Sequence, residues 1–338
     1  MKLLVSALEP SSNAHLEKIL QHRDDIELVG IFDKKFGNPI YDNSTTAVMG
    51  LVDAIKKIRF FLNLRKQMVH LASDVDKVLL IDGSGFNLPL AKKLKTKYPN
   101  LEITYYILPQ AWAWRRYRIK AIEKYCDRLF SILPFECEYY SHKCQFVGHP
   151  LLDSINEYKS DYTNQSIVFM PGSRRKEVES LMPVFRQLSQ KFSDQKLVLV
   201  VPKLLKGSQI YGDTSMFAVT TDVHGALKDA KHAFICSGTA TFEAALIGTP
   251  LTLCYIANKF DYKVARLLAH VKHTGLANII MQKAHNRLIH SEFFQEEVTA
   301  QNLYNDYLQM DTKQYQKDVV QLRTLIEKGS SQTVAKEL

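Results

Sequence analysis

Short apolar runs rich in strand-forming residues alternate with amphipathic helical segments along this chain, in two successive sets. Strands that alternate with helices predict parallel sheets covered by helices on both faces. The sequence therefore predicts an α/β protein made of two doubly wound, Rossmann-like domains. The expected strands are Lys2–Ala7, Glu27–Phe32, Lys77–Ile81, Glu102–Ile107 and Asp127–Ile132 in the first set, and Ser166–Met170, Lys196–Val201, Phe217–Thr220, Ala233–Cys236 and Leu251–Tyr255 in the second.

The division between the domains is expected in the polar stretch Glu157–Gln165, which has little apolar content and no helical period. A length of 338 residues also exceeds one ordinary core. The predicted parts are an N-terminal domain at 1–160, a C-terminal domain at 161–310 and a charged helical tail at 311–338. The tail either returns to the first domain or docks on another subunit. Facing domains of this kind bind ligands beyond the carboxyl ends of their strands, in the cleft between them, so residues that follow strands are the candidates for a site.

The composition favours anionic partners and a cytoplasmic location. Lys and Arg outnumber Asp and Glu by 44 to 35, a formal charge of +9, which attracts phosphorylated substrates, phospholipid headgroups or nucleic acid. No apolar run approaches the roughly 18 residues of a membrane-spanning helix. The odd number of cysteines, without metal-ligand spacing, predicts reduced thiols and no metal site. These cysteines are Cys126, Cys137, Cys144, Cys236 and Cys254.

Two polar clusters follow expected strands of the first domain. In the first, Glu9 stands between a strand and a helix start, where its carboxylate would face the cleft, and Ser11, Ser12 or Asn13 would cap the helix. In the second, Asp82 ends a buried strand in a glycine-bordered turn, IDGSGFN. A partly desolvated carboxyl there suits a general base for a sugar hydroxyl, while capping of the next helix is an equally good explanation of its position.

The IDGSGFN turn argues against a nicotinamide cofactor, because Leu88 occupies the position of the third glycine in a dinucleotide fingerprint. The pair Asp74 and Asp76 imitates a DxD metal motif. It precedes its strand, at the wrong end for a site, and we interpret it as a solvated turn.

Two further clusters open helices in the second domain. PGSRRKE places Arg174 after the strand SIVFM, at the start of a helix. Cations are unfavourable there because they oppose the helix dipole, and a bound anion would explain why they are tolerated. SGTATFE brings Ser237, Gly238 and Thr239 to the next such start, with Glu243 one turn further on the same face. The spacing suits a diphosphate held by the turn and a ribose held by the carboxylate. A solvated basic turn and simple helix capping are the structural alternatives.

A Trp/Arg segment and an apolar basic helix complete the candidates. The segment QAWAWRRYR holds Trp114 and Arg115 and would stack on a sugar, bind acyl chains or bind RNA, or else form a packing corner. The helix at Val48–Leu64 has a wide apolar stripe with basic flanks, as in helices that lie in anionic lipid, although core packing explains most such stripes. Its candidate membrane contacts are Val48, Met49, Val52, Ile55, Phe60 and Phe61.

The ordered motifs EPSS, AVMG, IDGSGFN, PQAWAWR, LPFE, FVGHP, PGSRRKEVE and SGTATFE, over residues 1–300, resemble the lipid A disaccharide synthases. The resemblance implies the GT-B architecture and an inverting transfer of 2,3-diacylglucosamine from UDP to 2,3-diacylglucosamine 1-phosphate, which gives a β-1,6-linked disaccharide. It implies no cofactor, since UDP is part of the donor, and a place in lipopolysaccharide synthesis of Gram-negative bacteria at the cytoplasmic side of the inner membrane. It also leaves room for a homodimer.

Carried onto this sequence, the resemblance implies Asp82 as the base, with Glu9 beside it as a second catalytic carboxylate. Ser11, Asn87, Trp114 and Arg115 are the expected acceptor-side contacts. Arg174, Ser237, Gly238, Thr239, Glu243 and Asn278 are the expected UDP-sugar contacts. The first loop departs from the family pattern, with Ser12 and Asn13 where Gly-Asp is usual, and Gly85 replaces a common acidic residue.

Two other functions fit parts of the pattern. A UDP-N-acetylglucosamine epimerase would share the nucleotide-binding half but needs no apolar basic helix. A basic RNA-binding protein would use the +9 charge and the Trp/Arg segment, and would bind RNA with salt-sensitive affinity.

Overall fold

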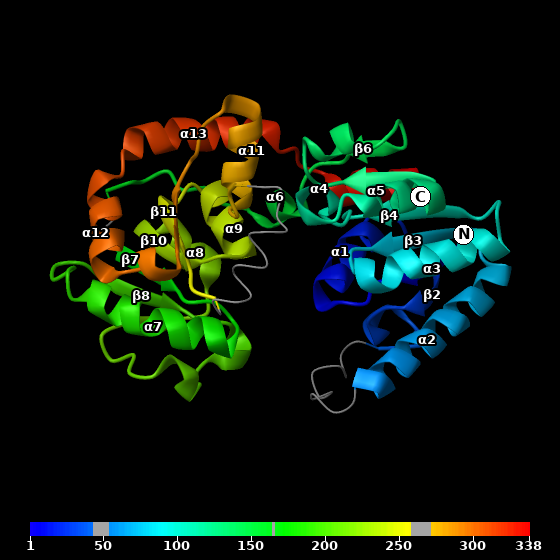
Figure 1. Ribbon diagram of the computed structural model, residues 1–338, viewed down its shortest axis with the longest axis horizontal. Coiled ribbons are helices and arrows are strands. Elements are labelled where there is room, and N and C mark those ends of the chain that lie inside the picture. Colours follow the sequence, from blue (N-terminus) through cyan, green and yellow to red (C-terminus); the bar gives the residue numbers. More distant parts are fainter. Residues whose placement is uncertain (43–53, 164–165, 258–271) are drawn as a thin grey trace. The chain divides into compact units, whose positions relative to one another are not determined.

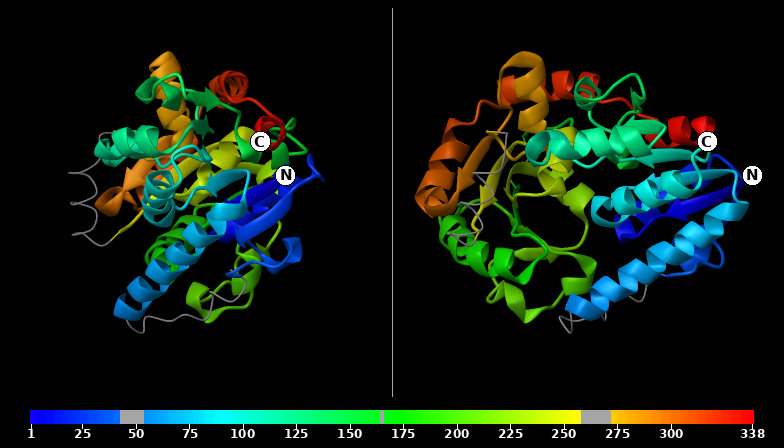
Figure 2. Two further views of the ribbon diagram at one scale, coloured as in Figure 1. Left: turned by 90° about the vertical axis from the view of Figure 1, so that its right-hand side faces the viewer. Right: turned by 45° about the vertical axis from the view of Figure 1, so that its right-hand side comes forward.

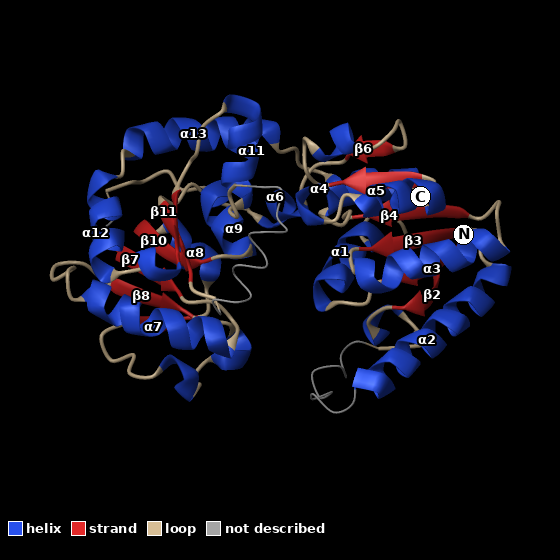
Figure 3. Cartoon of the chain, viewed as in Figure 1, coloured by secondary structure: helices blue, strands red, loops and turns tan. Residues whose placement is uncertain are grey.

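The computed structural model describes residues 1–42, 54–163, 166–257 and 272–338. These residues form two compact units, unit 1 (residues 1–153 and 327–338) and unit 2 (residues 154–326). Each unit contains a six-stranded parallel sheet with helices on its faces (Figures 1 and 3). The prediction of two α/β domains with parallel sheets is confirmed.

Unit 1 has the strand order β2-β1-β3-β4-β5-β6, with every neighbouring pair parallel. The strands are β1 (Lys2–Ser6), β2 (Glu27–Ile31), β3 (Lys77–Ile81), β4 (Glu102–Tyr106), β5 (Arg128–Ser131) and β6 (Cys144–Phe146). The helices are α1 (Pro10–Leu20), α2 (Ala54–Leu71), α3 (Ser84–Lys97), α4 (Ala111–Trp114), α5 (Tyr117–Tyr125), α6 (Pro150–Ser154), which ends at the boundary, and α14 (Ser330–Glu337).

The central strands of unit 1 supply two separate cores, because alternate residues of a strand point to opposite faces of the sheet. Leu4 of β1 and Leu80 of β3 pack in a cluster with residues of α2, α3 and α5. Leu3 and Leu79 pack on the other face with residues of α1 and α14. The nearly unbroken apolar character of these strands therefore reflects burial on both sides.

Unit 2 has the strand order β12-β11-β10-β7-β8-β9, again parallel throughout. Its strands are β7 (Ser166–Met170), β8 (Leu197–Val200), β9 (Ala218–Thr220), β10 (Ala230–Cys236), β11 (Leu251–Tyr255) and β12 (Ser291–Phe294). Its main helices are α7 (Arg175–Ser189), α8 (Val223–Lys228), α9 (Thr239–Ile247), α11 (Leu276–His285), α12 (Ala300–Gln309) and α13 (Thr312–Leu325). The sequence analysis missed β12 and, in unit 1, β6, which are short and only partly buried.

The tail does not form a part of its own, and the domain boundary differs from the predicted one. Arg323 of α13 donates to the carbonyls of Leu246 and Ile247, within unit 2. The chain then returns, and Val334 of α14 packs with α1, so both chain ends lie in unit 1 (Figure 2). The polar stretch 157–163 is also anchored to unit 2, because Lys159 N donates to the Ile247 carbonyl at 2.8 Å. This places the boundary after Asp153.

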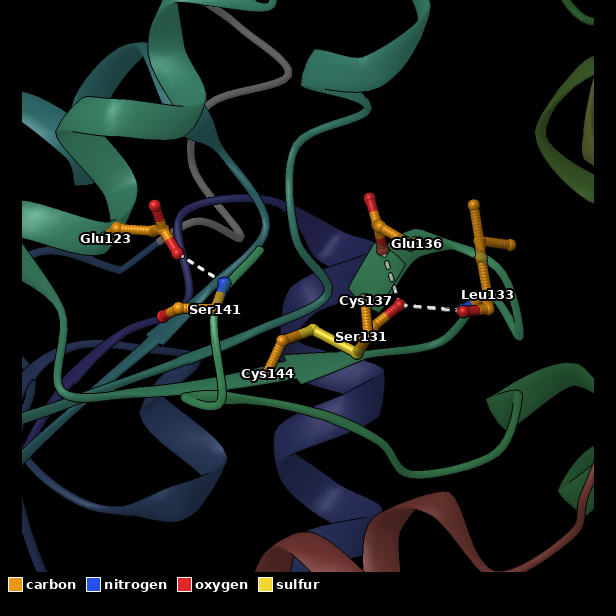
Figure 4. Close-up of a disulfide and its surroundings, with 7 residues drawn as sticks. All are labelled: Glu123, Ser131, Leu133, Glu136, Cys137, Ser141 and Cys144. Carbon is orange, nitrogen blue, oxygen red and sulfur yellow. Dashed lines mark hydrogen bonds between the residues drawn. A yellow bond between two sulfur atoms is a disulfide. The ribbon is translucent and has the colours of Figure 1, made fainter. Parts of the chain in front are cut away.

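The prediction of five reduced cysteines is wrong. Cys137 and Cys144 form a disulfide that joins η4 (Glu136–Tyr139) to β6 (Figure 4). Cys126, Cys236 and Cys254 are free and buried. The chain turns back between β5 and β6, so two residues seven positions apart come within bonding distance. Spacing alone does not reveal this turn.

In the part of the chain that the structure describes, no helix is long and apolar enough to cross a membrane.

Candidate functional site

The candidate catalytic residues of unit 1 lie where the order of its strands reverses. β1 is flanked by β2 on one side and β3 on the other, so the loops that leave β1 and β3 diverge at the carboxyl edge of the sheet. Open α/β sheets bind ligands in the crevice at such a point. Glu9 follows β1 and Asp82 follows β3. Strand order thus brings together two carboxylates separated by 73 positions in the chain.

The turn at Asp82 has an unusual backbone that neighbouring side chains hold in place. Asp82 has φ 51°, a left-handed conformation that Asp adopts more readily than most residues. Its carbonyl accepts hydrogen bonds from Tyr105 Oη and Asn87 Nδ2, both at 2.8 Å. Ser6 Oγ donates to Asn87 Oδ1 at 2.6 Å. These contacts hold the backbone of the turn and do not use the Asp82 carboxyl group.

Burial sets the ionisation of both carboxyl groups. It raises the pKa of Asp82 above its ordinary value, while the backbone N–H of Gly83 opposes the rise. Burial also raises the pKa of Glu9, and the nearby Asp82 carboxylate adds to the effect. Neither residue forms an ion pair with any described residue. A carboxylate that is partly desolvated and unpaired is a stronger base than an exposed one.

Polar side chains in this part of unit 1 make contacts within the protein. Asn87 is fully buried, and its amide hydrogen bonds join it to Ser6, Ile81 and Asp82, so it positions the turn. None of Ser11, Ser12 and Asn13 caps α1. The helix begins at Pro10 with Glu9 as an N-cap that makes no side-chain hydrogen bond.

The polar side chains near the start of α1 are used differently from the prediction. Asn13 Nδ2 donates to the carbonyls of Ala7 and Glu9, and Ser12 Oγ donates to the carbonyl of Ile81. Ser11 is exposed on the first turn.

The two tryptophans of the QAWAWR segment have different roles. Trp112 is buried and packs edge-on against Phe135, with ring centroids 4.8 Å apart. Trp114 is 48% exposed, and the Arg115 guanidinium lies 4.0 Å from its ring centre. The packing corner and the exposed contact surface are therefore adjacent parts of one short helix, α4.

The predicted membrane residues are only partly described. Val48, Met49 and Val52 lie outside the described residues, as does the side chain of Ile55. Phe60 and Phe61 pack against the core of unit 1, and the ring of Phe61 lies 6.0 Å from that of Phe86. These two phenylalanines are partly buried, and they add to the contact that the buried Leu64 and Met68 make between α2 and the core.

The predicted nucleotide-binding clusters of unit 2 also meet where strand order reverses. β7 lies between β8 and β10, so the loops after β7 and β10 diverge at the carboxyl edge. Gly172 (φ 98°) lies where these loops touch. A Cβ atom there would come within 2.6 Å of Glu177 Oε2 and 3.2 Å of Cys236 Sγ. The close approach of the two loops requires glycine at this position.

Arg174 is held by a partner that the sequence analysis did not use. Its Nη1 donates to Glu177 Oε1 at 2.8 Å, and its backbone N–H donates to Glu177 Oε2. Glu177 lies in the first turn of α7, so the unfavourable charge of the basic residues against the helix dipole is already offset. Glu177 therefore explains why basic residues are tolerated at this helix start, without a bound anion. Arg174 itself remains exposed, with 82% of its side chain accessible to a phosphate.

The start of α9 offers free backbone donors. Gly238 is its N-cap, and no side chain caps the helix. Gly238 and Thr239 are exposed, and Ser237 is half-buried. One turn further, Glu243 Oε1 and His224 Nε2 form a hydrogen bond of 2.6 Å. His224 carries no motif in the sequence, and only the fold brings α8 against α9.

Asn278, a predicted UDP-sugar contact, is fully buried in the structure. Its amide binds the backbone of Ile289 and His290 and the carboxylate of Glu292. It joins α11 to the start of β12. Its hydrogen-bonding groups are used within the protein, so it supports this part of unit 2.

Comparison with known proteins agrees with this arrangement. A family model described as lipid-A-disaccharide synthetase matches residues 3–337. The chain belongs to this family. A lipid-A-disaccharide synthase of Helicobacter pylori is 44% identical over 99% of this chain and 97% of its own length. That of Campylobacter jejuni is 40% identical over 99% and 98%.

Solved structures agree on the fold. A UDP-GlcNAc 2-epimerase from Neisseria meningitidis bound to UDP-GlcNAc matches with a TM-score of 0.64 at 11% identity, covering 100% of this chain and 99% of its own. The glycotransferase of kitacinnamycin matches with a TM-score of 0.62 at 14% identity, covering 99% and 96%. These likenesses confirm the predicted GT-B fold, and the family membership favours neither an epimerase nor an RNA-binding protein.

Proposed function

We propose that this chain is the glycosyltransferase that joins UDP-2,3-diacylglucosamine to 2,3-diacylglucosamine 1-phosphate and releases UDP. The family membership supports the reaction. The observation that carries the mechanism is the unpaired, partly desolvated Asp82 beside Glu9 in a strand-order crevice of unit 1.

Asp82 takes the proton of the acceptor's 6-hydroxyl as that oxygen attacks the anomeric carbon of the donor. The attack displaces UDP in one step and inverts the anomeric configuration, which gives the β-1,6 linkage. Glu9 is the second carboxyl group of the site, and the Asp82 carboxylate adds to the rise of its pKa that burial causes. The mechanism assigns proton transfer to unit 1.

The residues of unit 2 hold the leaving group. The backbone N–H groups at the start of α9 and the exposed guanidinium of Arg174 bind the diphosphate and stabilise the charge that develops on it. Glu243, held by His224, accepts hydrogen bonds from the ribose hydroxyls. In this proposal protein donors supply the positive charge, without a metal ion.

We further propose that the enzyme works at the cytoplasmic surface of the inner membrane, because both of its substrates carry acyl chains. The outer face of α2 supports this location. Ile58 is 60% exposed and Leu62 39% exposed, one helical turn apart, with Arg59 and Lys66 exposed beside them. Such a face suits an anionic lipid surface.

The test is disaccharide formation from the two synthetic substrates by the wild type, Asp82→Asn and Asp74→Asn. Asparagine tolerates the left-handed backbone at position 82, so the turn is kept while the base is lost. We expect Asp82→Asn to lower kcat by about 100- to 10,000-fold and to leave UDP binding, measured by calorimetry, unchanged. Asp74 is an exposed carboxylate at the opposite end of β3, and its variant should behave as the wild type. Near-normal turnover by Asp82→Asn would overturn the assignment of the base.

A further inference from the structure

Arg118 connects α5 to the turn that carries Asp82. It lies in the first turn of α5, and its Nη1 donates to Ser84 Oγ at 3.1 Å. Ser84 is the first residue of α3, two positions after Asp82. Arg118 is only half-exposed, although it belongs to a run of basic residues near the surface. The side chain therefore reaches inward, to the edge of the candidate catalytic crevice.

The charge of Arg118 is not neutralised within the described part of the chain. It forms no ion pair there, and the first turns of α3 and α5 contain no acidic residue. A cation beside the positive ends of two helices is unfavourable by itself. The neighbouring arginines have other partners, since Arg115 lies over Trp114 and Arg116 donates to the Trp112 carbonyl. A guanidinium placed in this way suits an anion that arrives with the substrate.

Arg118 and Asp82 approach the same crevice without pairing with each other. Burial is the main reason that the pKa of the Tyr105 hydroxyl lies far above its ordinary value, and the Asp82 carboxylate raises it further while Arg118 lowers it. Tyr105 Oη donates to the Asp82 carbonyl, and Arg118 donates to Ser84, so both side chains contact the short segment from Asp82 to Ser84. The acceptor needs this arrangement, because its 6-hydroxyl and its anomeric phosphate project from different parts of one sugar ring.

We propose that Arg118, together with the Ser84 hydroxyl, binds the 1-phosphate of the acceptor and so selects a sugar phosphate over the unphosphorylated sugar. The inference rests on the proposed function, since it takes Asp82 as the base for the 6-hydroxyl. The new element is Arg118 as the residue that orients the acceptor. The phosphate oxygens accept from the guanidinium and from Ser84 Oγ, and the sugar is thereby fixed with its 6-hydroxyl at the carboxylate.

The first test compares two acceptors, diacylglucosamine with and without the 1-phosphate, in the wild type, Arg118→Gln and Arg118→Lys. For the wild type we expect a clear preference for the phosphorylated acceptor. Arg118→Gln should raise KM for that acceptor by about 10- to 100-fold and leave KM for the unphosphorylated one unchanged. Arg118→Lys should recover part of the preference, because lysine keeps the charge and loses the paired donors. Lys120→Gln, an exposed cation on the same helix, is the matched control and should keep the full preference.

An equal loss on both acceptors in Arg118→Gln would overturn the assignment, because a structural role does not distinguish the two. A second measurement does not depend on turnover. Calorimetric titration with glucosamine 1-phosphate and with glucosamine should show phosphate-dependent binding in the wild type that Arg118→Gln and Ser84→Ala weaken. If the wild type makes no disaccharide but shows this binding, the proposed reaction fails and the phosphate site stands. If the wild type binds both sugars equally, the phosphate site fails.

Discussion

Glu136 gives the sharpest test of the energetics of unit 1, because a single carboxyl group is buried there without a cation. The residue is 1% exposed, and Ser131 Oγ donates to its Oε2 at 2.5 Å (Figure 4). Burial raises the pKa of Glu136 from 4.5 to about 8, although the hydrogen bond from Ser131 opposes the rise. In the folded protein at neutral pH the group is therefore mostly a neutral acid.

The magnitude follows from the two pKa values. Between them the folded state binds a proton that the unfolded state has released, so the free energy of unfolding falls as pH rises. The contribution of Glu136 is fully present below pH 4.5 and is lost as pH approaches 8. Glutamine has the shape of the neutral acid and does not ionise. The stability of the Glu136→Gln variant relative to the wild type should therefore increase by about 3.5 kcal/mol between pH 4.5 and pH 7.5.

Urea unfolding followed by tryptophan fluorescence measures this difference in stability. The signal reports on unit 1, because both tryptophans of the chain lie there and Trp112 lies beside Glu136. Other ionisable groups affect variant and wild type equally, so they cancel in the comparison. Glu138→Gln, an exposed neighbour, is the control and should show no pH-dependent difference. If the stability difference between Glu136→Gln and the wild type is the same at pH 5 and pH 7.5, the reasoning from burial is refuted.

Two further predictions concern the donor site and the membrane. His224→Ala should raise KM for the UDP-sugar by about 3- to 20-fold and change kcat little, because the Glu243 carboxylate loses the hydrogen bond that orients it. His224→Gln should retain part of the affinity. An equal fall in kcat would contradict a role in donor binding. Replacing both Ile58 and Leu62 by Glu should reduce co-sedimentation with anionic phospholipid vesicles several-fold without changing the unfolding midpoint. Undiminished vesicle binding would exclude this face of α2 as the membrane contact.

The positions of the candidate site loops could be predicted from the sequence because they depend on local pattern. Apolar runs end at residues such as Ile81 and Met170, and the chain must leave a parallel sheet at the carboxyl end of each strand. The polar residues that follow are therefore brought to one edge of each sheet. This is why Asp82, Arg174 and Thr239 could be selected before any coordinates.

The functions of several side chains could not be predicted, because they depend on partners distant in the chain. Asn87 and Asn278 follow candidate loops as a ligand-binding residue would, but their amides are used by buried backbone groups. Phe60 and Phe61 widen an apolar stripe, and only the packing of α2 shows that they face the core. Arg118 was included only as the last residue of the Trp/Arg segment, and no role was predicted for Glu136.

The sequence by itself determined the two α/β domains, the type of most elements and the edge of each sheet at which a site can form, since periodicity and chain direction are local properties. Only the tertiary structure decided which strands are neighbours, and so which loops diverge to form the two crevices. It also decided which polar groups are satisfied within the protein and which are left for substrates. That distinction depends on hydrogen bonds and charges between residues tens of positions apart, which no local pattern records.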